Sequence, residues 1–209
     1  MTAGPTFEKI DPVRFIGNYS SGKMGYAIAR ECAFRGAEVT LISGPVQLET
    51  PSSEIKRINV TSAQEMYEAA MNAFKDADVA ILSAAVADFT PETVQNSKVK
   101  RGKEDLVLKL KPTKDIARSL GEVKRNNQFM VGFALETNDE ETNALGKLQR
   151  KNLDLIVLNS LNDANTGFMH DTNKITIFDK KGRRTLYDLK TKQQVASDII
   201  DYLTTFIAE

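Results

Sequence analysis

The residues best suited to chemistry lie in the first 25 positions, which are dense in glycine, proline and small hydroxyl side chains. This stretch ends, directly before a helical pattern, in Ser20, Ser21, Gly22 and Lys23. A glycine-rich turn that enters a helix presents unpaired backbone N–H groups and the positive end of the helix dipole, which suit a phosphate. We therefore predict a phosphate-binding loop for a substrate at these four positions. The spacing of Gly17, Gly22 and Lys23 matches a P-loop, but Met24 replaces the hydroxyl that would bind magnesium, which disfavours that motif.

Three further side chains near the predicted loop and strand ends could act on a ligand. Arg14 could form a bidentate pair with a carboxylate or phosphate. Asn18 could donate a hydrogen bond to a developing oxyanion. Asp88 follows an apolar run and could hold a magnesium ion or bond a ligand hydroxyl, but it could equally be a helix N-cap or form an Asx turn.

The lysines most relevant to an anionic ligand are Lys98, Lys147 and Lys151. Lys147 and Lys151 lie four positions apart and thus on one helix face, where their mutual repulsion would be relieved by an anion between them. A solvated helix face is the alternative, and a solvated loop is the alternative for Lys98. Their positions near predicted strand ends favour an anion site.

Composition excludes several classes of protein and of chemistry. The 28 basic and 28 acidic residues balance, which argues against nucleic acid as a partner. Apolar runs of about six residues are too short to span a bilayer, and the single cysteine, Cys32, allows no internal disulfide, so we expect a cytoplasmic protein. His170 is the only histidine and is expected at the surface, which disfavours a histidine metal site. The remaining polar groups suit transfers at phosphorus by positioning and charge neutralisation.

Strand and helix patterns alternate along most of the chain. Buried strands are predicted at 39–43, at the start of 79–86, at 129–134 and at 155–158, with helices at 24–34, at 62–73 and ending near Lys151. This alternation predicts a single α/β domain over residues 1–209, with a Rossmann-like three-layer fold and a mainly parallel sheet. Ligands bind such sheets at the carboxyl ends of the strands, where the polar stretches 83–88, 132–137 and 159–162 fall. A β-hairpin at 174–178 and 184–187 and a helix from about 192 to 207 complete the prediction.

Several local features are also predicted. Ser62 is expected to cap a helix, with Glu65 completing a capping box, and Thr113 to cap a helix whose first turn contains Asp115. Residues 90–104 are polar and are expected to form a flap, and the alternating residues 106–110 an edge or dimer-contact strand. The flap or dimerisation segment thus covers about 90–110.

Eight short sequence words stand in order along the chain: TAGPT at 2–6, DPVR at 11–14, Asn18 with SSGKMG at 20–25, VTLISGPV at 39–46, AAVAD at 84–88, KVK at 98–100, GFA at 132–134 with ET at 136–137, and KNLDLI at 151–156. Together they make the chain resemble phosphopantothenoylcysteine synthetase, which in many bacteria is the carboxyl-terminal half of a bifunctional coenzyme A biosynthesis flavoprotein.

The resemblance implies a Rossmann-like ligase with Mg²⁺ and CTP, the latter as a substrate. The carboxylate of 4′-phosphopantothenate would attack the α-phosphate of CTP and release pyrophosphate, and the amine of L-cysteine would then displace CMP to form an amide. It also implies a homodimer in which segments around 90–110 meet, and fusion to an upstream flavin-dependent decarboxylase.

The resemblance also implies roles for individual residues. Asn18 and Arg14 would face the pantothenate and the acyl centre, with Lys98 on a flap above them. The nucleotide site would be formed by Leu82, Ser83, Ala84, Asp88, Lys98, Lys114, Asp115, Ile116, Ala117, Phe133, Lys147 and Lys151. Metal ligands are not identified. Two departures from the pattern are the missing apolar strand before Thr2, which means a very short first strand or a fragment, and Lys114, where proline is frequent.

Two other functions share this fold pattern. One is an NAD(P)-dependent oxidoreductase, although the chain lacks a contiguous G-x-G-x-x-G after a strand with an acidic residue about 20 positions later. The other is a non-catalytic nucleotide-binding module. The residues do not decide between CTP and ATP.

Overall fold

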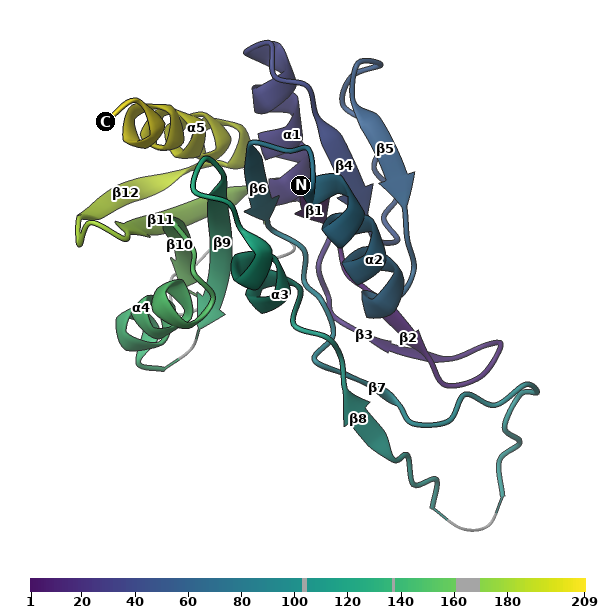
Figure 1. Ribbon diagram of the computed structural model, residues 1–209. Coiled ribbons are helices and arrows are strands. Elements are labelled where there is room, and N and C mark those ends of the chain that lie inside the picture. Colours follow the sequence, from purple (N-terminus) through teal and green to yellow (C-terminus); the bar gives the residue numbers. More distant parts are fainter. Residues whose placement is uncertain (103–104, 137, 161–169) are drawn as a thin grey trace.

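The computed structural model describes residues 1–102, 105–136, 138–160 and 170–209. Its centre is an eight-stranded sheet in the order β12-β11-β10-β9-β6-β1-β4-β5 (Figure 1). The strands are β1 (Thr2–Ala3), β4 (Thr40–Ser43), β5 (Lys56–Asn59), β6 (Val79–Leu82), β9 (Phe129–Glu136), β10 (Leu155–Ser160), β11 (Thr172–Asp179) and β12 (Arg184–Thr191). All strands from β10 to β5 in this order are parallel, and β11 and β12 are added antiparallel.

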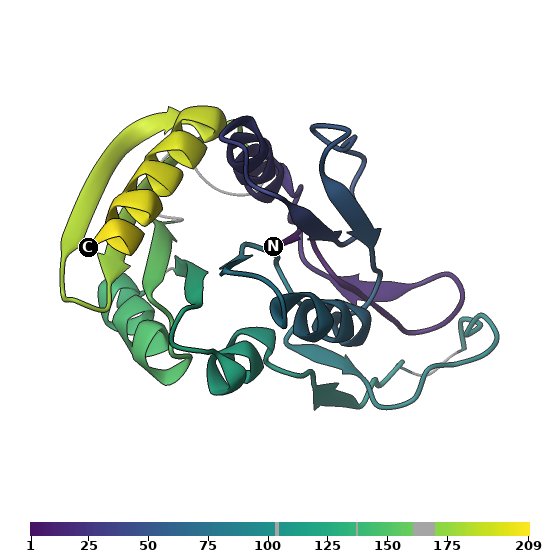
Figure 2. The ribbon, with the colours of Figure 1, turned by 45° about the horizontal axis from the view of Figure 1, so that its top comes forward.

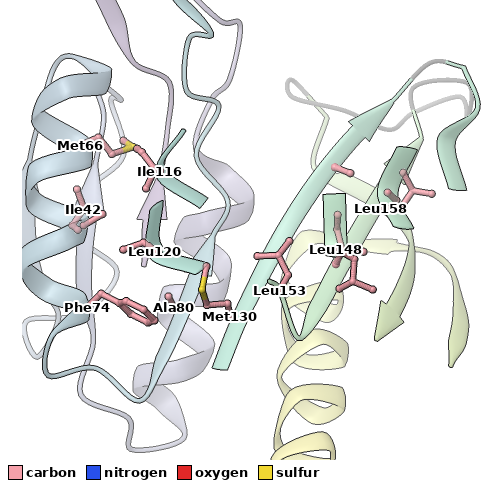
Figure 3. Close-up of a cluster of buried hydrophobic side chains, with 14 of the residues drawn as sticks. Ile42, Met66, Phe74, Ala80, Ile116, Leu120, Met130, Leu148, Leu153 and Leu158 are labelled. Atoms are coloured by element: carbon pink, nitrogen blue, oxygen red, sulfur yellow. The ribbon is translucent and has the colours of Figure 1, made fainter. Parts of the chain in front are cut away.

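Helices cover both faces of the sheet, which confirms the predicted three-layer α/β fold (Figure 2). They are α1 (Lys23–Phe34), α2 (Ala63–Phe74), α3 (Ile116–Val123), α4 (Glu140–Arg150) and α5 (Lys192–Ala208). Helices α2, α3 and α4 bury apolar side chains such as Met66, Leu120 and Leu148 against one face (Figure 3). On the other face, Ile28 of α1 and Ile199 of α5 pack against strand residues that include Val157.

The helix ends follow from local chemistry, with two corrections. Ser62 caps α2 as predicted, but the Glu65 carboxylate accepts a hydrogen bond from the N–H of Thr61, so the expected capping box is not formed. The prediction that Thr113 caps α3 is wrong: Asp115 is the N-cap, and the Thr113 hydroxyl donates to the Ala87 carbonyl at 2.7 Å. That tertiary hydrogen bond joins Thr113 to the loop after β6 and makes it unavailable to the helix.

Two small antiparallel ribbons stand apart from the main sheet. One pairs β2 (Phe7–Lys9) with β3 (Phe15–Gly17), and the other pairs β7 (Phe89–Pro91) with β8 (Leu110–Pro112). The β7–β8 ribbon lies in the segment predicted as a flap, and its described residues project away from the body of the molecule (Figure 1). The flap residues 103 and 104 lie outside the described residues.

The strand predicted at 106–110 is wrong except for its last residue. Leu106, Val107 and Leu108 have no regular structure, and Val107 is 85% exposed. An alternating sequence becomes a strand only when another strand satisfies its backbone groups, and in the described chain that partner begins opposite Leu110.

The other local predictions hold. Gly36 ends α1 with φ +84°, and Cys32 packs within that helix. The hairpin and the last helix form as β11, β12 and α5. His170 is exposed, and positions 137, 161 and 162 of the predicted polar stretches lie outside the described residues.

Candidate active site

The candidate site lies where the strand order of the sheet reverses. The chain passes from β1 outward to β4 and β5, and then returns to place β6 on the other side of β1. The connections that leave β1 and β6 lead to opposite faces of the sheet, to α1 on one and to α3 on the other. Such a switch point is where open α/β sheets bind ligands. Backbone hydrogen bonds tie the two loops together, from the N–H of Ala85 to Gly4 at 2.9 Å and from the N–H of Thr6 to Ala85 at 3.3 Å.

Three glycines allow the backbone to come close at this point. Gly4 and Gly22 have φ of +76° and +77°, a region that glycine enters without strain. A Cβ on Gly25 would lie 2.5 Å from Cβ of Ala3 and 2.6 Å from Oγ of Ser83, so α1 can pack on β1 and β6 only without one. Gly4, Gly22 and Gly25 follow the order of the glycines in a dinucleotide-binding motif, but residues 5–21 stand where that motif has a single residue. The insertion is why the contiguous motif is missing from the sequence.

A cleft of about 130 Å³ opens beside these glycines. Its walls come from the turn and first residues of α1, the loop after β6, the carboxyl ends of β9 and β10, the start of β11, and the first residue of α5. The residues predicted from sequence that line it are Ser20, Ser21, Gly22, Lys23, Ser83, Ala84 and Phe133. The tertiary structure thus brings the predicted phosphate loop and part of the predicted nucleotide site to one cleft.

The polar character of this cleft points to a ligand. Ser83 Oγ, Asn159 Oδ1 and Asn173 Oδ1 are buried there without a hydrogen-bond partner among the described residues. Buried polar groups are nearly always paired, so these atoms need an explanation. A bound molecule would supply their partners.

Two basic groups, Lys23 and Lys192, and the starts of two helices line the cleft. Gly22 provides no side-chain cap to α1, and the first turn of that helix lines the cleft. Lys192, the first residue of α5, is 7% exposed and also lines the cleft. Burial, and then the nearby charge of Lys23, lower the pKa of Lys192 below its usual value. An anion bound here would favour the charged form of Lys192, because an opposite charge offsets the cost of burial.

Asn173 and Lys192 are site residues that sequence reasoning missed. Asn173 is 3% exposed and lies on β11, and Lys192 begins α5, far along the chain from residues 20–25. Lys192 in fact lay at the start of the predicted last helix, but no local pattern relates that start to the phosphate loop. Only the antiparallel addition of β11 and the packing of α5 beside α1 place them together.

Asn18 and Leu82 adjoin residues that line the cleft, and Lys23 lines it. Asn18 is exposed, and its amide donates to the carbonyls of Ala85 and Val86 at 3.0 and 3.2 Å. Leu82 ends β6 at the edge of the cleft. Lys23 donates to Asp171 at 2.6 Å.

Lys147 and Lys151, between which an anion is predicted, each have a carboxylate partner in the described structure. Lys147 pairs with Glu136 at 2.5 Å, and Lys151 pairs with Asp115 at 3.0 Å. Each lysine therefore has its own partner, which lowers the need for a shared anion.

The side chain of Lys114 contacts an aromatic ring. Its ammonium lies 4.4 Å from the ring centroid of Tyr67, in cation–π contact. The neighbouring predicted residues Ile116 and Ala117 open α3, and Ile116 is buried in the apolar cluster.

Arg14, Lys98 and Asp88 lie outside the cleft. Arg14 pairs with Asp11 at 2.6 Å. Lys98 is exposed and lines a wider hollow of about 520 Å³ within the flap. Asp88 is exposed where the flap begins, and its carbonyl accepts from the N–H of Thr113. We place the site at the smaller cleft, because the unpartnered buried atoms are there.

Two searches of the described residues gave negative results. They contain no group of three or more His, Cys, Asp or Glu side chains that could hold a metal ion. None of their helices has the length and apolar character needed to cross a membrane.

Comparison with known proteins identifies the family. Residues 1–207 match the family described as the DNA/pantothenate metabolism flavoprotein C-terminal domain. The chain belongs to this family. The match spans nearly the whole chain, as the eight sequence words do.

Similar proteins are longer than this chain. It is 58% identical over 207 residues to a protein of an unknown prokaryotic organism named cysteine/cysteine sulfinic acid decarboxylase, covering 99% of the chain and 58% of that protein. It is 48% identical over 200 residues to the coenzyme A biosynthesis bifunctional protein CoaBC of Bacillus subtilis, covering 96% of the chain and 49% of that protein. The chain thus spans about half the length of the curated relatives it matches.

A solved member of the family has the same fold. The crystal structure of the C-terminal domain of a CoaBC protein matches with a TM-score of 0.84 at 42% identity, covering 99% of this chain and 93% of that one. This agreement confirms both the Rossmann-like fold and the family that the sequence words indicated.

Proposed function

We propose that this domain is a phosphopantothenate–cysteine ligase of coenzyme A biosynthesis that uses CTP. The observation that carries the proposal is the cleft at the switch point, where uncapped helix N–H groups, Lys192 and three unpartnered polar atoms converge. This combination suits a small phosphate ester that also carries hydrogen-bonding groups. The family, and the names of its bifunctional relatives, support the reaction class.

In the first step, the carboxylate oxygen of 4′-phosphopantothenate would bond to the α-phosphorus of CTP, and pyrophosphate would leave with the electrons of the broken P–O bond. The turn at Gly22 would hold the phosphate of 4′-phosphopantothenate. Lys98, Lys147 and Lys151 would neutralise the triphosphate, with Lys147 and Lys151 partly exchanging their present carboxylate partners for it.

Mg²⁺ would fit this scheme as an ion shared with the triphosphate. It is usually held in proteins by one or two carboxylates together with substrate phosphates, and it neutralises their charge. Asp88 is the exposed carboxylate at this edge of the sheet that we assign to it.

In the second step, the amine of L-cysteine would attack the activated acyl carbon, and CMP would leave with the electrons of the acyl–oxygen bond. Asn18 holds the loop after β6 through the carbonyls of Ala85 and Val86. By exchanging one of these hydrogen bonds, its amide would donate to the oxyanion that forms at this carbon.

The test is release of pyrophosphate by the full chain with each of the four nucleoside triphosphates. We expect release to require both CTP and 4′-phosphopantothenate, and CMP and amide to appear only when L-cysteine is added. Hydride transfer to NADP without pyrophosphate would favour an oxidoreductase, and binding without turnover would favour a nucleotide-binding module. Carbon dioxide release from cysteine or cysteine sulfinate would favour the activity for which one relative is named.

A matched variant tests the second step by itself. Asn18→Ala is expected to slow amide formation more than pyrophosphate release. Equal loss in both steps would count against a role at the acyl centre.

We also propose that the chain forms one ligase domain over residues 1–209, which pairs with a second copy through its flap. The exposed apolar side chains Leu106, Val107 and Leu108 are gathered there, and clustered exposed apolar side chains often mark interfaces. Sedimentation should show a dimer that Val107→Asp weakens.

The bifunctional relatives are about twice as long as this chain. Fusion of this domain to an upstream flavin-dependent decarboxylase agrees with that length and stays a prediction.

A further inference from the structure

Asp11 organises the turn at residues 11–14. Its side chain is among the most buried charged groups, with the residue 2% exposed. One carboxylate oxygen, Oδ1, accepts from the backbone N–H groups of Val13 at 2.8 Å and Arg14 at 2.9 Å. These two hydrogen bonds lie within the turn and involve only one of the two carboxylate oxygens.

The other oxygen of Asp11 holds the flap. Oδ2 accepts from Nε and Nη2 of Arg14 at 3.0 and 2.6 Å, and from the N–H of Val99 at 3.1 Å. Nη2 of Arg14 in turn donates to the carbonyl of Val99 at 2.5 Å. The Asp11–Arg14 pair thus binds both backbone groups of one flap residue.

This attachment is the main one that the flap has near its lysines. In the described structure, the hydrogen bonds of residues 93–102 all go to residues 10–14, the remaining one joining the N–H of Gln95 to the carbonyl of Ile10 at 2.9 Å. Lys98 and Lys100 flank Val99 directly. Where Val99 is held therefore decides where both lysines stand.

The carboxylate stays charged over the working range of pH. Burial by itself would raise the pKa of Asp11, but the hydrogen bonds from Val13, Val99 and Arg14 outweigh it and keep the pKa far below the usual value of 3.8. Hydrogen bonds to ionised groups are the strong ones, and the Asp11 side chain that accepts them is fully buried.

We propose that Asp11 is a positioning residue, which with Arg14 latches the flap at Val99 and so sets the place of Lys98. Arg14, which we expected to bind a ligand, acts in this arrangement through the flap. The proposal rests on the proposed function in so far as Lys98 serves the nucleotide. The contacts themselves do not depend on it.

The competing explanation is that Asp11 only stabilises its own turn. Asp11→Asn removes the charge that pairs with Arg14. Val99→Pro removes the N–H that the flap donates, and its ring also fixes φ at position 99 and restricts the backbone of Lys98. Val99→Ala is the matched control, because it keeps both backbone groups of Val99. Hydrogen exchange of peptides over residues 93–102 measures the latch without any substrate.

We expect Asp11→Asn and Val99→Pro to speed exchange in the flap at least tenfold, with exchange in α2 and behaviour of Val99→Ala unchanged. In pyrophosphate release, both should lower kcat/KM for CTP about tenfold and leave the KM for 4′-phosphopantothenate within twofold. Combined with Lys98→Gln, Asp11→Asn should add less than twofold, because it acts through that lysine.

Unchanged exchange in the flap would overturn the latch. Independent multiplication of the Asp11→Asn and Lys98→Gln effects would overturn the positioning role. If the wild-type chain released no pyrophosphate, the proposed function would fail while the exchange experiment still decided the latch. If Asp11→Asn failed to fold, Val99→Pro would give the same two answers.

Discussion

Replacing Gly25 by alanine tests the geometry of the switch point most directly. The added Cβ would lie 2.5 Å from Cβ of Ala3 and 2.6 Å from Oγ of Ser83. Carbon atoms attract best at about 3.5–4.0 Å, so α1 must retreat from β1 by about 1 Å. Ser83 can rotate its hydroxyl away, but the methyl of Ala3 is fixed to the backbone.

We expect Gly25→Ala to lower activity more than it lowers the free energy of unfolding. Overpacking costs about 1–3 kcal/mol, and alanine offsets about 1 kcal/mol because it favours the helix over glycine. The free energy of unfolding should thus fall by about 0–2 kcal/mol, a decrease in Tm of at most about 8 °C. A displacement of about 1 Å at a reacting centre costs about 100-fold in rate. The start of α1 carries the phosphate loop, so we expect Gly25→Ala to lose about 100-fold in kcat/KM.

Pyrophosphate release and calorimetry on the same samples measure the two effects separately. Gly36→Ala is the matched control, because a Cβ at this position meets nothing within 4 Å. The backbone of residue 36 has a left-handed φ of +84°, which alanine adopts only with strain. This substitution should cost about 1–2 kcal/mol and leave kcat/KM unchanged. Wild-type kinetics in Gly25→Ala, or an equal loss of activity in Gly36→Ala, would refute the reasoning.

Three further predictions concern buried groups. Asp154 is fully buried and accepts from the Met130 N–H and from two lysines, Lys124 and Lys180, so Asp154→Ala should cost about 3–5 kcal/mol in urea unfolding, and a loss below about 1 kcal/mol would contradict this. Burial raises the pKa of Cys32 to about 11 from 9.0, so at pH 8 native Cys32 should react with iodoacetamide about 100-fold more slowly than Cys32 unfolded in urea. The stability that this thiol contributes below pH 9 should be lost as the pH rises through about 11. Equal labelling rates would show that the thiol is exposed. Lys192→Gln should raise the KM for 4′-phosphopantothenate about tenfold and leave that for pantothenate unchanged, whereas a change confined to CTP would assign the cleft to the nucleotide.

Local sequence patterns predicted most of the fold because they coincide with the tertiary structure. The apolar runs at 129–134 and 155–158 became β9 and β10, which are buried on both faces. Ser62 and Gly36 marked helix ends through hydrogen bonding and a positive φ that depend on a few neighbouring residues only. Such signals survive folding, because no distant partner is needed to form them.

Predictions failed where a distant group competes for the same residue. Thr113 looked like a helix cap, but it bonds to Ala87 instead. Residues 106–110 alternate like a strand, yet pairing begins only at Leu110.

The order of residues alone determined the α/β alternation and, through its sequence words, the family, and it predicted the turn at 20–23 as a phosphate loop. Only the tertiary structure decided that Asn173 and Lys192 complete the same cleft, and that Gly4, Gly22 and Gly25 act together. The physical reason is that strand order is set by pairing between segments far apart in the chain. A site at the point where this order reverses exists only after those pairings have formed.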